Sequence, residues 1–519
     1  MIRRTCVLVV LALLTPACGG VTSLQASGPD TERLAIALPR DGGPINIFAG
    51  GVSDPLVELV YDKLLAPSPY VADPLPWLAE RVEQVDPRTW DVQIRDGVTW
   101  HDGEPLTAED VRFTFQYFVE APTGRYTHHV SEVPEIADVA LTGDRSLRFT
   151  CAYPCPELGP ITFADLPIIP EHVWSGVAEP ATRADLPIGS GPYRLVDYSP
   201  TSGYRFEANE AYFAGVPRVG ELIMPVIPDP STAFTALRSG EIDAVARPLP
   251  PELTDSLGTD ERLGVITVAP LQFDELRLNY QRPPFDDPQV RRGLSLAIDR
   301  QALLDTVLLG QGRVALQGYP HPDSPWTNPN LSTPYDPDEA RRLLAGREIS
   351  FDIDVSGSEP TQVRAAELVA QQLAAVGVTA TVRPTDAATI ADLFRTRDFD
   401  AYVNTITAHG VADPTQFIMS HRSGYLWDAP ELPYPERDAL EARWRAQETI
   451  EDRTTVLFEM QELFNRQPTS IPLYYPDERW AFGPAYDGWA ESPGHGIVHK
   501  WSFLPDDVRT QANAVVTRS

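Results

Sequence analysis

The amino-acid sequence predicts an α/β fold, in which strands and helices alternate along most of the chain. Three consecutive segments carry this prediction. Residues 349–355 alternate apolar and polar side chains as a strand does, residues 366–376 repeat apolar side chains at helical spacing before Gly377, and residues 378–382 alternate again. A strand, a helix and a strand in this order are typical of sheets whose strands are largely parallel.

Other segments fit the same pattern. Residues 34–38 and residues 90–94 each alternate apolar and polar side chains, which predicts two more strands. Thr107, with an acidic residue three positions later, predicts the N-terminus of a helix whose apolar stripe runs through residues 111–118.

A further helix is predicted to end at Gly240, because glycine readily adopts the left-handed conformation that terminates helices. Ser231 or Thr232 is its expected N-cap. The 51 prolines are scattered, mostly in loops and at helix starts. No internal repeat is visible, so we expect separate domains rather than a repeat array.

Composition and charge are those of a folded globular protein. The 519 residues are enough for two or three domains with hydrophobic cores, and 43% of them are hydrophobic. The 42 basic and 73 acidic side chains give a formal net charge of −31. Such a surface repels phosphate backbones and anionic headgroups, so we expect no nucleic-acid partner. Nearly all the positive charge is arginine, since lysine occurs only at Lys63 and Lys500.

The N-terminus has the features of a secretory signal, predicted at residues 1–17. Two arginines precede a short apolar run that ends in small residues. The run is far shorter than the about 20 residues that span a bilayer. Cys18 directly after Ala17 resembles a bacterial lipobox, which predicts an extracytoplasmic protein held to the cell membrane by a lipid on Cys18. Residues 18–30 would then be a flexible tether, and ordinary secretion with a chance cysteine is the alternative.

Cys151 and Cys155 are the other cysteines that remain after the signal is removed. Pro154 and Pro156 exclude a helix at this point. In an oxidising compartment such a pair predicts a disulfide that closes a tight loop. No histidine or further cysteine lies nearby in sequence, so we expect no metal site there.

Motifs of known enzyme classes are missing from the sequence. It has no Gly-x-Ser-x-Gly elbow, no His-Glu-x-x-His and no Walker loop. Gly310 begins a Gly-x-Gly-x-x-Ala run, but the run follows a helical pattern rather than a strand. His495 and His499 have the spacing of helical metal ligands, but neighbouring glycines and a proline oppose a helix. We therefore predict no cofactor, no metal and no catalytic residues.

Several segments resemble one known family, and they follow in the same order over residues 60 to about 480. They include Val60-Tyr61-Asp62-Lys63-Leu64-Leu65, Trp77-Leu78-Ala79-Glu80, Trp100-His101-Asp102-Gly103-Glu104-Pro105-Leu106-Thr107, Gly189-Ser190-Gly191-Pro192-Tyr193, Asn209-Glu210-Ala211-Tyr212-Phe213 and Leu296-Ala297-Ile298-Asp299-Arg300. In these segments the chain is similar to the family 5 extracellular solute-binding proteins, the oligopeptide, dipeptide and nickel receptors of ABC importers. Most of the segments also contain ordinary turn and cap signals, so they indicate the fold and not the ligand.

The resemblance implies a two-lobed, periplasmic-binding-protein-like α/β fold with an extra inserted subdomain. Lobe I would comprise residues 31–65, 185–268 and 470–519. The inserted subdomain would comprise residues 66–184, and lobe II residues 269–469. The ligand would bind between the lobes, which would close by a hinge motion where these ranges meet.

The residue that anchors peptides in this family is different here. Peptide-binding relatives carry an aspartate four residues before the proline of an Asp-Pro motif, where it pairs with the N-terminal ammonium of the peptide. The motif here is Asp413-Pro414, and the aspartate position is Gly410. The tryptophan usual just before it is replaced by Thr407 and Ala408. We therefore expect a ligand that is neutral, blocked or held along its length.

Candidate ligand contacts lie near that motif and in proline-rich loops. His409 follows a predicted strand that is expected to end at the cleft, where it could donate a hydrogen bond to a ligand or coordinate it; an ordinary loop histidine is the alternative. Aromatic side chains nearby could stack on a ligand, and core or loop packing is the alternative for each of them. The candidate ligand-binding residues are His409, Asn279, Tyr280, Tyr319, Trp326, Tyr425 and Trp427.

Two classes of function remain open. The leading hypothesis is a receptor that captures a peptide or other small polar solute and docks on an ABC permease with its ATPase subunits; a nickel-type metal-chelate receptor is a variant of it. The rival is a secreted hydrolase on an α/β scaffold. Aromatic side chains around a large cavity would favour the receptor, and two close carboxyls with raised pKa values would favour the enzyme.

Overall fold

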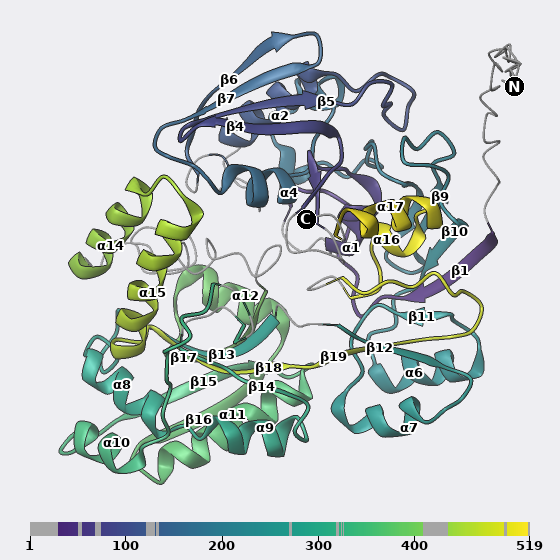
Figure 1. Cartoon of the computed structure of the whole chain (residues 1–519). Coiled ribbons are helices and arrows are strands. Elements are labelled where there is room, and N and C mark those ends of the chain that lie inside the picture. The colour runs from purple at the N-terminus through teal and green to yellow at the C-terminus, as the bar shows by residue number, and fades with distance from the viewer. Residues whose placement is uncertain are drawn as a thin grey trace, which may run out of the picture.

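The computed structural model places most of the chain in a mixed α/β fold with two large sheets and two smaller ones (Figure 1). The described residues are 30–49, 54–67, 74–120, 130, 134–268, 272–317, 321–322, 324, 326–407, 434–492 and 496–516. In this part of the chain, no helix combines the length and hydrophobicity that a membrane span requires.

Lobe I is built on a seven-stranded sheet. In spatial order its strands are β12 (Gly264–Val268), β19 (Glu478–Phe482), β11 (Ala244–Val245), β1 (Thr31–Ala37), β10 (Val219–Met224), β9 (Gly203–Ala208) and β8 (Tyr193–Ser199). Its helices are α1 (Asp54–Val60), α6 (Pro230–Ser239), η3 (Pro251–Leu253), α7 (Thr254–Gly258), α16 (Lys500–Phe503) and α17 (Asp506–Val516). The C-terminal segment thus returns to the lobe in which the described chain begins.

An inserted subdomain with a four-stranded antiparallel sheet stands beside lobe I and shares its hydrophobic core. Its strands are β4 (Ala79–Asp86), β5 (Thr89–Ile94), β7 (Ser146–Cys151) and β6 (Ile136–Gly143), and the short pair β2 (Leu65–Ala66) and β3 (Leu75–Pro76) leads into it. Its helical segments are α2 (Ala108–Glu120), η1 (Leu158–Thr162), α4 (Phe163–Asp165), α5 (Glu171–Trp174) and η2 (Pro180–Thr182). The predicted capping box of α2 is confirmed, because the Asp110 carboxylate accepts from the Thr107 N–H at 2.8 Å while the Thr107 hydroxyl accepts from the Asp110 N–H at 3.4 Å.

Lobe II has a six-stranded sheet and hydrophobic clusters of its own. In spatial order its strands are β14 (Gly312–Val314), β18 (Ser470–Pro476), β13 (Gln272–Leu278), β17 (Ala401–Thr407), β15 (Ser350–Ser356) and β16 (Thr379–Thr385). Its helices are α8 (Pro288–Ala297), α9 (Arg300–Val307), α10 (Pro337–Leu344), α11 (Pro360–Ala374), α12 (Ala387–Thr396), α14 (Pro435–Ala446) and α15 (Ile450–Arg466). The predicted unit at residues 349–382 is confirmed as β15, α11 and β16, with β15 and β16 parallel.

The sheets are mixed, which corrects the prediction of largely parallel strands. Among the described strands, parallel pairing occurs between β1 and its neighbours β10 and β11, and between β15 and its neighbours β16 and β17. Short turns join β4 to β5, β6 to β7 and β8 to β9. A short connection can only join antiparallel strands, because a parallel pair needs a long crossover.

The N-cap of α6 is Asp229, which corrects the prediction of Ser231 or Thr232. The Asp229 carboxylate accepts a hydrogen bond from the Thr232 N–H at 2.7 Å, and a proline occupies the first helical position. Proline suits that position because it has no N–H to satisfy. The helix ends as predicted at Gly240, where φ is 78°.

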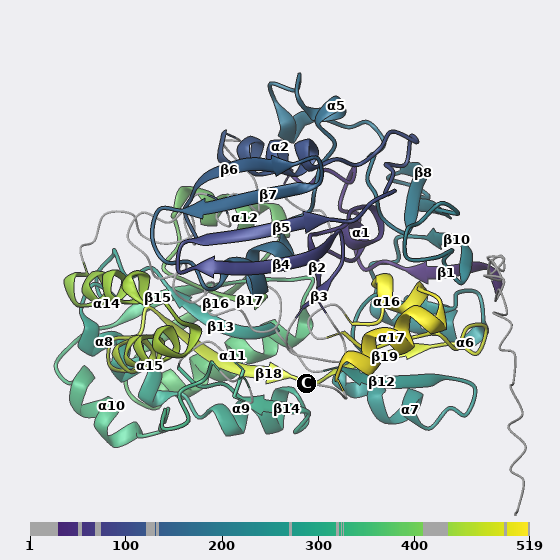
Figure 2. The same ribbon diagram turned by 45° about the horizontal axis from the view of Figure 1, so that its top comes forward.

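The described chain crosses between the lobes after β12 and again after β18 (Figure 2). The second crossing lies near residue 477, because Ser470–Pro476 pairs with β13 in lobe II. This corrects the predicted lobe boundary at residue 470. Side chains along β18 are buried on both faces of the strand. The hydrophobicity of this segment therefore does not indicate which of the two large sheets it joins.

Candidate functional site

The carboxyl ends of the parallel strands in both lobes point toward the crossings. In lobe I, the chain beyond β11 hydrogen-bonds through the Leu249 N–H to the carbonyl of Arg479, next to the crossing. In lobe II, β17 ends at Thr407, which pairs with Gln272, the first residue of β13. Ligands of open α/β sheets bind outside the carboxyl ends of parallel strands. The region between the lobes at the crossings is therefore the candidate site.

Two of the buried carboxyl groups next to the crossings, those of Asp274 and Glu478, have raised pKa values. Asp274 in β13 accepts hydrogen bonds from the Thr405 hydroxyl at 2.6 Å and from the Gln362 amide at 3.4 Å. Burial nevertheless raises the pKa of Asp274 to about 6. Glu478 begins β19, and burial raises its pKa to about 7, although the indole N–H of Trp480 lies 3.4 Å from its carboxylate. Both groups are therefore poised to change charge in the range of physiological pH.

Neither of these two acids was among the residues predicted from the sequence. Each lies in a strand where most neighbouring side chains are buried. No hydrophobic pattern in the sequence indicates them, because β13 reads Gln-Phe-Asp-Glu-Leu-Arg-Leu and β19 begins Glu-Arg, and their burial arises from packing alone.

We expect the substitution Glu478→Gln to stabilise the protein at high pH only. The pKa is about 7 in the folded protein and 4.5 ordinarily, so the folded state binds this proton more tightly than the unfolded chain. The resulting contribution to stability is fully present below about pH 4 and is lost as the pH rises through about 7. Glutamine cannot lose a proton, so the variant is more stable by about 3 kcal/mol near pH 8 and by less than about 1 kcal/mol near pH 5.

Urea unfolding at both pH values measures this difference. Glu241→Gln, at an exposed position of lobe I, is the matched control, and it should change stability by less than about 0.5 kcal/mol at either pH. An equal effect of Glu478→Gln at both pH values would contradict the raised pKa.

Asn279 and Tyr280 follow the end of β13 that is far from the crossing. The strand begins beside Thr407 at the crossing, and Asn279 follows its far end, about 20 Å away at the rise of a strand. The Asn279 side chain is buried and donates to the carbonyls of Arg397 and Phe399 at 3.2 and 2.9 Å. Asn279 thus ties β13 to the chain before β17, and ligand contacts of Asn279 and Tyr280 stay predictions.

Tyr280 is half-buried, with the guanidinium of Arg291 5.8 Å from its ring centre. Trp326 packs against the cluster formed by α14, α15 and β13 in lobe II, and its carbonyl accepts from the Gln461 amide at 2.7 Å. The contacts described for Tyr280 and Trp326 are therefore all within lobe II.

The remaining predicted ligand contacts fall outside the described residues. These are His409, Tyr319, Tyr425 and Trp427, and the same holds for Gly410 and for the predicted lipid site Cys18. Strand β17 ends at Thr407, two residues before His409 in the sequence. This strand end lies on the side of lobe II that faces the crossings. Ligand contacts of these residues stay predictions.

A profile of the family described as "Bacterial extracellular solute-binding proteins, family 5 Middle" matches residues 73–427, more than half of the chain. The chain belongs to this family. Protein XP55 of Streptomyces lividans is 33% identical over 333 residues, which cover 64% of this chain and 57% of XP55. The oligopeptide-binding protein AppA of Bacillus subtilis is 25% identical over 553 aligned residues, covering 95% of this chain and 97% of AppA.

The fold of this solute-binding protein is that of known two-lobed binding proteins. The structure of NikZ from Campylobacter jejuni in complex with Ni(L-His) superposes with a TM-score of 0.79 at 22% sequence identity. The superposition covers 92% of this chain and 100% of NikZ. The described chain therefore has the family's architecture from β1 onward.

Two of the family motifs of this solute-binding protein, the one with His101 and the one with Gly189 and Gly191, contact each other. The ring of His101 lies between the glycines of the Gly189-Ser190-Gly191 segment, where Nδ1 is 3.3 Å from the Gly189 N–H and Nε2 is 3.0 Å from the Gly191 carbonyl. The N–H can only donate and the carbonyl can only accept, so the ring is neutral with its proton on Nε2. Burial lowers the pKa of His101, which keeps it neutral. Added Cβ atoms at Gly189 and Gly191 would lie 2.0 and 2.5 Å from carbonyl oxygens of α1, so this contact requires glycine.

No metal centre forms in the part of this protein that the structure describes, where no three histidine, cysteine or acidic side chains come together. His499 is buried, and its Nε2 contacts the Ala490 carbonyl at 2.9 Å. A small pocket near Asn46, Trp174 and Arg183 is lined only by residues of lobe I and the inserted subdomain. The region between the lobes therefore remains the candidate site.

Proposed function

We propose that the protein is a lipid-anchored, extracytoplasmic receptor of an ABC importer, which captures a peptide or another small polar solute between its two lobes. The observation that carries the proposal is the family profile over residues 73–427, on a fold whose parallel strands end at the crossings in both lobes. Ligands of such folds bind at those strand ends, and closure around them is a hinge motion.

The relatives support a solute of this kind but not one ligand. One is named as an oligopeptide-binding protein and another is bound to Ni(L-His). Oligopeptides and Ni(L-His) are both polar solutes, and a site between two lobes can enclose either of them. The missing aspartate at Gly410 favours a ligand other than a short peptide with a free amine.

A hydrolase is the rival proposal, because Asp274 and Glu478 both have raised pKa values near the crossings. In a catalytic carboxyl pair each charge raises the pKa of the other. Here burial is the main cause for both groups, and neither carboxyl contributes to the shift of the other. They also lie on strands of different sheets. These facts favour the receptor.

Native mass spectrometry of the protein purified from its own host tests the proposed function. We expect a copurifying solute that leaves on gentle activation, and its mass decides among peptide, metal chelate and other solutes. Incubation with a mixed peptide library under the same conditions is the test of the rival. New product masses that disappear in an Asp274→Asn variant would contradict the receptor and support a hydrolase.

The lipid anchor is tested by the substitution Cys18→Ser. We expect the wild-type protein in the membrane fraction and the variant in the medium, because a lipoprotein signal needs its cysteine. Mass spectrometry of the mature N-terminus shows whether a diacyl group is present. Membrane association that is the same in both proteins would contradict the anchor.

A further inference from the structure

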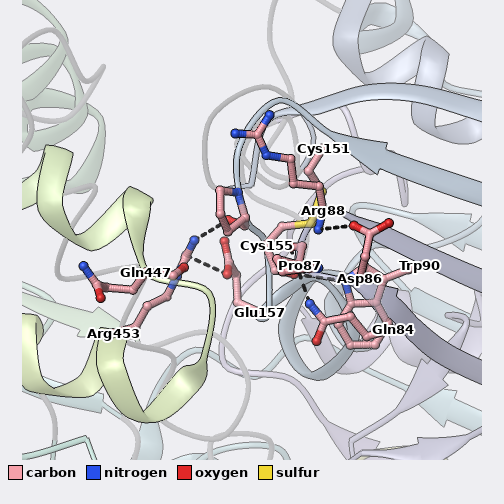
Figure 3. The surroundings of a disulfide bond; sticks show 11 residues. Gln84, Asp86, Pro87, Arg88, Trp90, Cys151, Cys155, Glu157, Gln447 and Arg453 are labelled. Atoms are coloured by element: carbon pink, nitrogen blue, oxygen red, sulfur yellow. Dashed lines mark hydrogen bonds and ion pairs between the residues drawn. A yellow bond between two sulfur atoms is a disulfide. The ribbon is translucent and has the colours of Figure 1, made fainter.

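The Cys151–Cys155 disulfide closes a short loop of the inserted subdomain (Figure 3). The two Cα atoms are 6.4 Å apart. The N–H groups of Cys151 and Cys155 donate to the carbonyls of Arg88 and Pro87 at 2.9 and 2.8 Å. The indole of Trp90 donates to the Cys155 carbonyl at 3.0 Å. The loop is thereby held against the turn between β4 and β5.

Helix α15 of lobe II reaches this loop through Arg453. Its Nη1 lies 2.6 Å from a carboxylate oxygen of Glu157, just after the disulfide, and its Nη2 donates to the Pro154 carbonyl (Figure 3). The Arg453 and Glu157 side chains are 1% and 2% exposed. A fully buried ion pair therefore joins the inserted subdomain to lobe II.

Aromatic rings complete the contact. The Arg453 guanidinium lies 4.0 Å from the centre of the Trp444 ring in α14. The Arg445 guanidinium lies 4.8 Å from the ring of Tyr153, in the disulfide loop. The planar guanidinium groups stack favourably on aromatic faces. Arg453 and Arg445 of lobe II thus contact Glu157 and Tyr153 of the inserted subdomain. Trp444 packs against Arg453 from within lobe II.

This contact bridges parts that the backbone does not connect directly. The disulfide loop belongs to the inserted subdomain, whose core is continuous with that of lobe I, whereas α14 and α15 pack on the sheet of lobe II. Among the described residues, Arg364 of α11 and Glu252 of η3 form another ion pair between the lobes, but these side chains are 42% and 48% exposed. Hinge opening would pull Glu157 and Arg453 apart.

We propose that the disulfide loop and α14–α15 form a latch that engages when the lobes close and releases when they open. The proposal extends the proposed function, since it concerns a charged contact that the receptor completes each time its lobes close. For a buried ion pair, the cost of desolvation roughly cancels the attraction. Such a pair can therefore close and open reversibly, while a closed state with only one of the two charges is disfavoured.

The test compares closed fractions by single-molecule FRET without added ligand. Dyes on Leu141→Cys in β6 and Leu309→Cys beyond α9, in a Cys18→Ser background, report the separation of the two parts at positions 46% and 55% exposed. In Glu157→Gln, Arg453 stays buried without its counter-charge, and we expect the odds of the closed state to fall about tenfold or more. The double variant Glu157→Gln/Arg453→Met buries no charge and should recover most of the closed fraction.

Glu459→Gln is the matched control. It removes the surface pair of Arg443 and Glu459, which joins the same two helices at 2.7 Å but lies entirely in lobe II. We expect it to leave the closed fraction unchanged.

The disulfide provides a second arm of the test. The double variant Cys151→Ser/Cys155→Ser releases the loop without changing its charges, and it should lower the closed fraction in the same direction. Closed fractions that are equal in wild type, Glu157→Gln and the serine variant would overturn the latch, and so would a wild type with no closed population. Because no ligand is needed, these outcomes are independent of the solute search that tests the proposed function.

Discussion

The substitution Lys500→Met should lower the free energy of unfolding by about 3–5 kcal/mol, the largest loss of stability that we expect from one side chain. The reason is that it leaves a carboxylate buried without a counter-charge. Lys500 and Asp62 are 1% and 0% exposed, and Lys500 Nζ lies 2.7 Å from the Asp62 carboxylate.

Asp62 is the centre of a network that joins distant segments of lobe I. Besides Lys500, the indole of Trp77, the hydroxyl of Tyr212 and the hydroxyl of Ser190 donate to its carboxylate at 2.8, 2.9 and 3.2 Å. These side chains come from segments that carry the family resemblance, which explains why residue types so far apart in sequence occur together. Hydrogen bonds alone do not replace the positive charge, because each neutral donor is worth about half of a charged one.

Urea unfolding at neutral pH measures the effect, with the double variant Asp62→Asn/Lys500→Met as control. The double variant removes both charges, so we expect it to recover a large part of the loss. A loss below about 1 kcal/mol in Lys500→Met would contradict the charge-pair argument.

Unmodified di- and tripeptides should bind about two to three orders of magnitude more weakly than to a receptor that carries an aspartate at position 410. A buried ammonium needs a counter-charge, since an isolated buried cation is very costly to desolvate. The family resemblance implies that peptide-binding members supply it with an aspartate at the position of Gly410 in this chain. Gly410 lies outside the described residues, so the prediction rests on the sequence.

Calorimetry with a mixed library of short peptides is the measurement, and Gly410→Asp is the matched variant. We expect Gly410→Asp to gain affinity for unmodified peptides and to leave N-acetylated peptides unaffected, because acetylation removes the ammonium. Sub-micromolar binding by the wild type that is lost on N-acetylation would show that another acid anchors the ligand. Asp274 and Glu478 are buried acids next to the crossings, and the variants Asp274→Asn and Glu478→Gln would then test them.

Elements with a strong local signal were predictable. The unit β15, α11 and β16 follows the periodicity of residues 349–382, and the capping box of α2 lies within four residues of sequence. The N-cap of α6 was misplaced by two or three positions, since serine and threonine compete with Asp229 for the same role. Such a boundary depends on which side chain caps the first backbone N–H groups of the helix, and hydrophobic periodicity does not indicate this.

The candidate site was predictable only in its position. The resemblance placed it between two lobes, but Asn279 and Tyr280 proved to lie at the far end of β13, because a strand separates its two ends by many ångströms. The raised pKa values of Asp274 and Glu478 come from burial, which arises only when both sheets and their helices have packed.

The α/β class, the family and the main helices and strands could be predicted from the sequence, because these depend on local periodicity and on motifs of a few residues. Tertiary structure alone decided that β18 belongs to lobe II, that Lys500 reaches Asp62, and that Arg453 meets Glu157. The partners in these two ion pairs are about 440 and 300 positions apart. No local pattern encodes contacts at that separation, since they depend on how whole lobes pack.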